Sequence, residues 1–183
     1  QVERFDALSP SALEAARLWQ SALRATLASE DEREIFSTAP AQGTARLRRA
    51  IAHHLRGTRG MNVDPDNIVI GAGAQLLDTM LVQLLGADKV YAVEDPGYLR
   101  LTRIYQAMGC KVRHIPLDDE GVVLSTLQKS GTDVLHLMPS HQYPTGLVTS
   151  IARRYALLSW AAERAGRYLI EDDFDCEFRL AGK

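Results

Sequence analysis

The chain has 183 residues, of which 46% are hydrophobic, and a formal net charge of -2 from 21 basic and 23 acidic side chains. Its size and hydrophobicity allow the core of one domain or slightly more, and its near-neutral charge argues against nucleic-acid binding through this segment. It contains no apolar run that could cross a membrane, and Cys110 and Cys176 form no metal-binding pair, which favours a reducing, cytoplasmic compartment.

Two helices are predicted in the first 60 residues. The first begins at Ser9 and Pro10, because serine can cap a helix and proline suits its first position. The second covers about residues 44–56, where leucine and isoleucine recur every four residues and an arginine-rich face is expected to lie in solvent. We assign residues 1–60 to an N-terminal helical segment and residues 61–183 to the ligand-binding portion of the domain.

Strands and helices alternate from residue 67 onwards. Strands are predicted at residues 67–70, 89–94, 111–115, 133–138 and 167–171, and helices at 76–85, 98–108, 124–129 and 151–165. Alternation of this kind builds βαβ crossovers and a mostly parallel sheet. The predicted fold is therefore α/β, a three-layer sandwich with a mostly parallel sheet.

The first two strand ends carry a glycine turn and a tyrosine. In open parallel sheets ligands bind beyond the carboxyl ends of the strands. The turn at 71–75, Gly-Ala-Gly-Ala-Gln, lets the backbone approach a phosphate at a helix N-terminus, although such turns also occur without a ligand. It is not a Walker A loop, and Leu76 breaks the GxGxxG spacing. Tyr98 opens the next helix, where its ring can cover a flat heterocycle or simply pack.

The later strand ends carry a polar loop and an acidic segment. The loop at 139–146, Pro-Ser-His-Gln-Tyr-Pro-Thr-Gly, presents three possible hydrogen-bond donors, His141, Gln142 and Tyr143. The acidic residues are Glu171, Asp172, Asp173 and Asp175. One of these carboxylates can face a cationic ring nitrogen. Alternatively, the four acidic residues can hold a divalent metal such as Mg or Ca. Their spacing in the sequence does not distinguish the ring-nitrogen interpretation from the metal interpretation.

These segments together resemble the fold-type-I aminotransferases, and more narrowly the aminotransferase-like domain of MocR- and GabR-type regulators of the GntR family. The resemblance is carried by GAGAQ, EDPGY, PSHQYPTG, IARRYALLSWA and RYLIEDDFDCEF, in that order, and covers nearly the whole chain from about residue 35. It implies pyridoxal phosphate as the cofactor, and it identifies the chain as a fragment of the large domain of that fold.

The resemblance also implies a role for particular residues. The phosphate cup falls on Gly73, Ala74 and Gln75, the ring-stacking aromatic on Tyr98, the residue near the ring hydroxyl on Tyr143, and the carboxylate that pairs with the ring nitrogen on Asp172. That carboxylate keeps the nitrogen protonated, so that the ring acts as an electron sink.

Two departures from the family pattern concern the ring oxygen and the lysine. Phe174 stands where the family often has a tyrosine that bonds the ring oxygen, and Tyr143 is the alternative source of that contact. The Schiff-base lysine is expected beyond the C-terminus, because Lys183 follows the Asp172 strand too early to be its equivalent. We therefore expect no catalytic residue and no transaminase turnover in this chain, and weak, non-covalent cofactor binding at most.

The function implied by the resemblance is effector sensing. The domain would bind pyridoxal phosphate and a small amino compound, in a homodimer, while a preceding winged-helix domain would bind DNA. The alternative is part of a catalytically active class I/II aminotransferase, so whether the parent protein is an enzyme stays open. A nucleotide-binding Rossmann domain is a further alternative, disfavoured by the missing GxGxxG and the acidic strand end.

Overall fold

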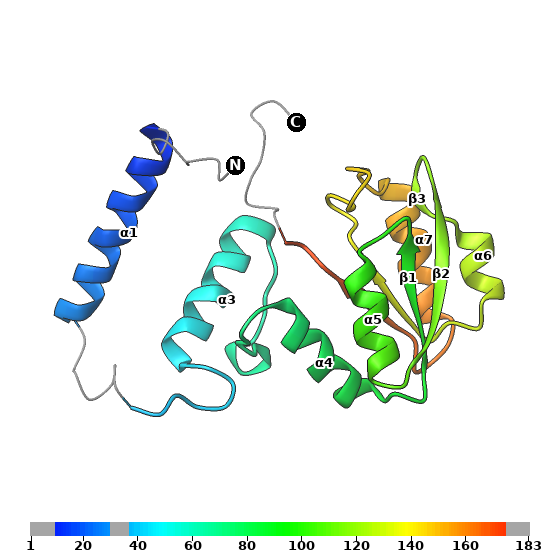
Figure 1. Cartoon of the computed structure of the whole chain (residues 1–183), viewed down its shortest axis with the longest axis horizontal. Helices are drawn as coiled ribbons and strands as arrows, with labels where there is room; N and C mark the ends of the chain where they lie inside the picture. The colour runs from blue at the N-terminus through cyan, green and yellow to red at the C-terminus, as the bar shows by residue number, and fades with distance from the viewer. Residues whose placement is uncertain (1–9, 30–36, 175–183) are drawn as a thin grey trace, which may run out of the picture. The chain divides into compact units, whose positions relative to one another are not determined.

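A computed structural model of the chain describes residues 10–29 and 37–174 (Figure 1). The chain separates into two compact units, residues 1–70 and 71–183. The predicted division after residue 60 remains a prediction. No helix in the described ranges is both long and apolar enough to span a membrane.

The first unit contains the helices α1 (Pro10–Ser29) and α3 (Ala45–Arg59) and the short 3-10 helix η1 (Pro65–Asn67). Thr44 caps α3 by accepting a hydrogen bond from the Leu47 N–H at 3.4 Å, as its sequence position favours. The prediction for the arginine-rich face was wrong at Arg48, which is buried and donates to the Pro65 carbonyl at 2.6 Å and to Asp66 at 2.8 Å. A guanidinium is held out of solvent there because fixed acceptors surround it.

The strand predicted at residues 67–70 is absent. Residues 65–67 form η1, and residues 68–70 pair with no strand in the part of the chain that the structure describes. Instead, the Ile70 N–H donates to the Gln42 carbonyl at 3.0 Å. An apolar run becomes a strand only where a neighbouring strand completes its hydrogen-bond ladder, and the run itself does not reveal whether that neighbour exists.

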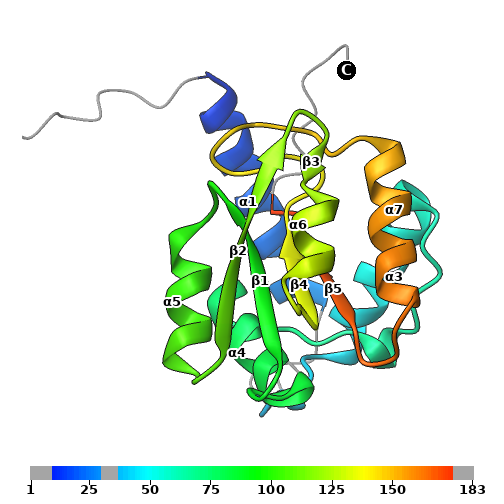
Figure 2. The same ribbon diagram turned by 90° about the vertical axis from the view of Figure 1, so that its right-hand side faces the viewer.

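A five-stranded sheet forms the centre of the second unit (Figure 2). Its strands are β1 (Val90–Asp95), β2 (Lys111–Asp118), β3 (Gly121–Val122), β4 (Val134–Leu137) and β5 (Tyr168–Glu171), in the order β3-β2-β1-β4-β5. All neighbours are parallel except β2 and β3, which form an antiparallel pair. The mostly parallel sheet confirms the prediction, while β3 was not predicted.

Helices cover both faces of this sheet, as Figures 1 and 2 show for α5 on one side and α6 and α7 on the other. The helices are α4 (Ala74–Leu85), α5 (Leu99–Ala107), α6 (Leu124–Lys129) and α7 (Ile151–Ala162). Alternate residues of β1 point to opposite layers: Tyr91 and Val93 pack with α4 and α5, and Ala92 packs with α6 and α7. The predicted three-layer α/β sandwich is therefore confirmed.

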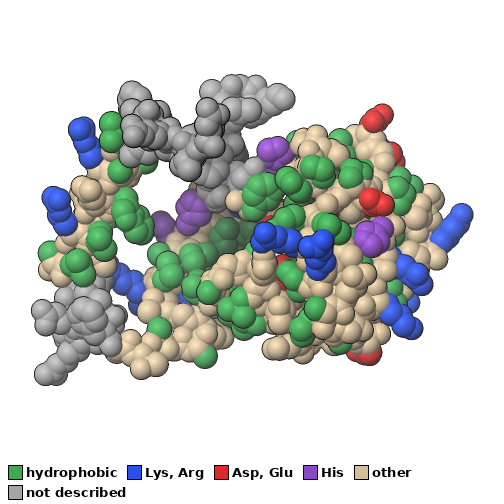
Figure 3. Space-filling view, viewed as in Figure 1, with side chains coloured by type: hydrophobic (Ala, Val, Ile, Leu, Met, Phe, Trp, Pro, Cys, Tyr) green, Lys and Arg blue, Asp and Glu red, His purple; other side chains and the backbone are tan. Residues whose placement is uncertain are grey.

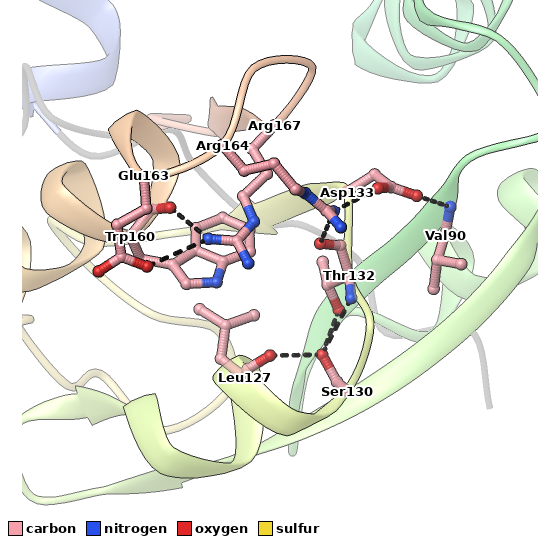
Figure 4. A network of polar contacts seen from close by, with 9 residues as sticks. All are labelled: Val90, Leu127, Ser130, Thr132, Asp133, Trp160, Glu163, Arg164 and Arg167. Atoms are coloured by element: carbon pink, nitrogen blue, oxygen red, sulfur yellow. Dashed lines mark hydrogen bonds and ion pairs between the residues drawn. The ribbon is translucent and has the colours of Figure 1, made fainter.

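A polar network holds the amino-terminal ends of β1 and β4 (Figure 4). Asp133 accepts a hydrogen bond from the Val90 N–H at 2.9 Å and a charged one from Arg164 at 2.5 Å. Arg167, which follows α7, lies over the Trp160 ring at 4.5 Å and donates to the Trp160 carbonyl. The network fastens the end of α7 to the sheet at the edge opposite the carboxyl ends of the strands.

Candidate functional site

A cavity of about 310 Å³ lies at the carboxyl end of the sheet. Its lining residues are Ala72, Gly73, Ala74, Gln75, Asp78, Tyr98, Leu101 and Asp172. They come from the glycine turn and first turns of α4, from the start of α5, and from the end of β5. Five of the six residues predicted for the site thus meet at one cavity, and Tyr143 is the one that does not line it.

The N-terminus of α4 supplies the backbone side of the cavity. Gly73 precedes the helix with φ 94° and ψ 163°, a conformation essentially confined to glycine, and no side chain caps the helix. The first N–H groups of a helix have no partner within it, so those of Ala74 and Gln75 remain for a ligand. With the helix dipole they favour an anion, and a phosphate suits this position.

Tyr98 and Tyr143 form an aromatic pair next to the cavity. Their rings meet edge to face, with centroids 5.9 Å apart and an interplanar angle of 89°. Tyr98 lines the cavity, whereas Tyr143 is 51% exposed. Tyr143 is therefore placed against the residue predicted to cover the ring, and its own predicted contact with the ring oxygen remains a prediction.

Gln142 joins the loops that carry the two tyrosines. Its side chain is buried, and its amide nitrogen donates to the carbonyls of Pro96 at 2.9 Å and Tyr143 at 2.6 Å. Its amide oxygen accepts from the N–H of Thr145 at 3.2 Å and from the Thr145 hydroxyl at 2.5 Å. The glutamine of the SHQYPTG motif therefore connects the loop after β1 with the loop after β4.

Glu94 is a buried carboxylate at the end of β1. One of its oxygens accepts from the Met138 N–H at 3.1 Å and lies 3.4 Å from the Gln142 amide nitrogen, while the other has no hydrogen-bond partner. Burial raises the pKa of Glu94, and these hydrogen bonds only partly oppose that shift.

A second carboxylate, Asp78, lines the cavity together with Asp172. Burial raises the pKa of Asp78; the nearby His136 opposes the shift, and the Asp172 carboxylate adds to it. No lysine or arginine is among the described lining residues, so the acidic side of the cavity favours a cationic group. Asp78 was not predicted as a site residue. The signal that could have identified it is a single acidic residue in an otherwise uncharged helix, one turn after the glycine turn.

The acidic segment after β5 lies only partly within the described residues. Phe174 stacks on His141 with ring centroids 6.3 Å apart and an interplanar angle of 14°. Asp175, one of the four acids considered for a metal, lies outside the described residues. Within the described ranges, no three His, Cys, Asp or Glu residues are placed to hold a metal ion.

Comparisons with known proteins agree with this geometry. A family model described as aminotransferase class I and II matches residues 6–172. The chain is 41% identical over 175 residues to the HTH-type pyridoxine biosynthesis transcriptional regulator PdxR of Corynebacterium glutamicum, covering 96% of this chain and 38% of that protein. It is 30% identical over 142 residues to the probable rhizopine catabolism regulatory protein MocR of Rhizobium meliloti, covering 77% of this chain and 30% of that protein.

A solved structure gives the same picture. The α-aminoadipate aminotransferase LysN of Thermus thermophilus, complexed with N-(5'-phosphopyridoxyl)-L-leucine, superposes with a TM-score of 0.70 at 26% identity. The match covers 87% of this chain and 39% of LysN. The chain therefore spans less than two fifths of the length of each of these three proteins.

Proposed function

We propose that this chain, which belongs to the aminotransferase class I and II family, binds pyridoxal phosphate within the sensing domain of a MocR-type transcription regulator. The family and the phosphopyridoxyl complex of a structural neighbour indicate pyridoxal phosphate as the cofactor of this fold. The observation that carries the proposal is one cavity lined by an uncapped helix N-terminus, an aromatic ring and two carboxylates.

The lining fits the two ends of the cofactor. The N–H groups of Ala74 and Gln75 at the N-terminus of α4 would hold the phosphate. They would do so without a basic side chain, because no lysine or arginine is among the described lining residues. Tyr98 would cover the ring, and Asp172 would pair with the ring nitrogen and keep it protonated. When bound, the cofactor supplies a ring that withdraws electrons from an attached amino compound.

The regulatory part of the proposal draws on the relatives. PdxR and MocR are named as regulators, and the HTH in the name of PdxR denotes a DNA-binding helix-turn-helix. We infer that a small amino compound acts at this cavity as an effector, that DNA is contacted through another domain, and that the protein works as a cytoplasmic homodimer. The exposed apolar residues Ile151, Tyr155 and Leu158 on α7 favour association with a further protein surface.

Calorimetric titration of this chain with pyridoxamine phosphate tests the binding proposal. This probe carries an amine in place of the aldehyde, so it does not react with surface lysines. We expect saturable binding that Asp172→Ala weakens about ten- to a hundredfold, because a hydrogen bond to a charged group is lost. Glu171→Ala, which removes an exposed acid next in sequence, is the matched control and should bind like the wild type. A folded wild-type chain that shows no saturable binding would overturn the proposal.

A second experiment separates regulator from enzyme. The protein that carries this segment should bind DNA upstream of its target genes, and pyridoxal phosphate with the correct amino compound should change that affinity. Transaminase turnover without any DNA binding would favour the aminotransferase alternative.

A further inference from the structure

A buried histidine lies behind the carboxylate side of the cavity. His136 is on β4 and is 2% exposed. Its Nδ1 lies 2.5 Å from the Tyr105 hydroxyl of α5 and 4.0 Å from Asp78 of α4. Its Nε2 lies 3.8 Å from an oxygen of Asp172 and has no hydrogen-bond partner. The ring therefore stands between the two carboxylates that line the cavity.

The hydrogen bond with Tyr105 links the tautomer of the ring to the phenol hydroxyl. Burial raises the pKa of Tyr105 far above its usual value, and the Asp78 carboxylate adds to the shift, so the phenol keeps its proton. With Tyr105 as the donor, Nδ1 is the acceptor and the ring carries its N–H group on Nε2. The N–H group consequently faces Asp172.

We propose that His136 is a positioning residue for Asp172: Tyr105 fixes the tautomer, and the Nε2–H group, 3.8 Å from the Asp172 carboxylate, attracts it electrostatically and keeps it directed toward the cavity. The inference deepens the proposed function, because it rests on the assignment of Asp172 to the cofactor. It also accounts for a polar side chain on a strand whose other residues are apolar, since a buried imidazole without a partner carries a free-energy cost.

The surrounding charges explain why an N–H donor is required. Three carboxylates interact with His136: Asp78 from α4, Glu94 from β1, and Asp172 after β5. Burial is the main cause that raises the pKa of Asp78 and of Glu94, and the Asp172 carboxylate adds to both shifts because like charges repel one another. A donor directed at Asp172 offsets this repulsion, and an aliphatic residue at position 136 would leave it unopposed.

Nitrogen NMR of the chain without any ligand tests the tautomer. The ¹⁵N resonances of His136, assigned by their loss in His136→Gln, should show a protonated Nε2 and an unprotonated Nδ1. Tyr105→Phe keeps the ring packed on Tyr91, whose centroid lies 4.7 Å away, but removes the hydroxyl, so it should mix the two tautomers. A proton on Nδ1 in the wild type would overturn the inference, whether or not the cofactor binds.

Pyridoxamine phosphate affinity tests whether His136 acts through Asp172. His136→Leu should weaken binding about tenfold, within the range for coupled residues of one network, while His136→Gln keeps a donor near the Nε2 position and should restore most of the affinity. In an Asp172→Asn background, His136→Leu should have no further effect. An equal loss in both backgrounds would show that the ring is only structural.

Control measurements keep the outcomes distinct. Circular dichroism checks that each variant is folded, and Tyr105→Phe replaces His136→Leu in the titrations if that variant does not fold. A wild-type chain that shows the expected tautomer but binds no pyridoxamine phosphate would contradict the proposed function. A chain that binds the probe, with no coupling between positions 136 and 172, would contradict this inference alone.

Discussion

At the scale of single residues, Gln142 determines how the two tyrosine-bearing loops meet. Gln142→Ala removes the donor to two carbonyls, Pro96 and Tyr143, in a buried position. We expect a loss of about 1–3 kcal/mol in the free energy of unfolding, the cost of leaving a buried polar group unsatisfied. Urea denaturation measures it. Gln128→Ala, the same change at an exposed position on α6, should alter stability little, and equal effects of the two substitutions would contradict the connecting role.

Glu94 should make stability depend on pH. Its pKa in the folded chain is raised above the ordinary 4.5, so its contribution is fully present below pH 4.5 and is lost as the pH rises through the raised pKa. Glu94→Gln has no proton to lose and escapes that loss. The unfolding free energy of the variant minus that of the wild type should therefore increase from pH 4.5 upwards.

Denaturation curves at several pH values measure this difference. Glu163→Gln, which removes an exposed carboxylate paired with Arg167, is the control because it leaves the buried cluster unchanged. A Glu94→Gln difference that stays constant over the whole pH range would show that burial of Glu94 does not couple to folding.

Chain order explains why Tyr98 and Asp172 lie at one cavity: Tyr98 follows β1 after a two-residue turn, Asp172 follows β5 directly, and parallel topology brings such positions to one edge. Their roles were predicted from the family resemblance, because the spacing of the four acids alone did not single out Asp172. Asp78 and His136 lie inside a helix and a strand, where position alone gives no sign of a neighbour. The roles of Asp78 and His136 depend on contacts with side chains from other helices and strands, and the hydrophobic periodicity of a segment does not predict such contacts.

At the scale of elements, the N-terminus of α4 depends on one backbone conformation. Gly73→Ala would place a side chain at φ 94°, where strain costs about 1–3 kcal/mol, although no atom lies near enough to clash. The turn must relax, so the N–H groups of Ala74 and Gln75 shift. We expect lower stability together with weaker binding of pyridoxamine phosphate in calorimetry.

Gly131→Ala is the matched substitution for this test. Gly131 also has a positive φ, 70°, and open space around its Cα, but it lies in the loop between α6 and β4 and does not line the cavity. It should lower stability and leave the affinity unchanged. If both variants bind the probe equally well, the backbone of α4 does not hold the phosphate.

The elements themselves differ in how far the sequence determines them. Helix α6 begins and ends where it was predicted, at residues 124 and 129, and four of the five predicted strands exist. Strand β3 has two residues, too few for any periodicity, and forms because the chain turns back on β2. The segment at 67–70 looked like a strand from its composition, yet pairing decides strand formation, and pairing is a property of the whole fold.

At the scale of the whole molecule, the polar network of Figure 4 and the candidate cofactor cavity lie at opposite edges of the sheet. The network around Asp133 and Arg164 fastens the amino-terminal edge, and the cavity lies at the carboxyl edge. Figure 3 shows hydrophobic side chains on the surface of the molecule. Leu84 on α4 and Ile151 on α7 are among the most exposed of the large hydrophobic residues. These surfaces favour further protein contacts, as expected if the chain functions as part of a larger assembly.

The division into two units gives a prediction for hydrogen exchange. Every residue that lines the cavity lies between residues 72 and 172, in the second unit. Pyridoxamine phosphate at a hundred times its Kd should stabilise that unit by about 2.7 kcal/mol, since a ligand that binds only the folded state shifts the unfolding equilibrium. Globally exchanging amides of β1 and β4 should then slow about a hundredfold. Amides of α3, in the first unit, should exchange at an unchanged rate. Equal slowing in both units would show that they unfold as one.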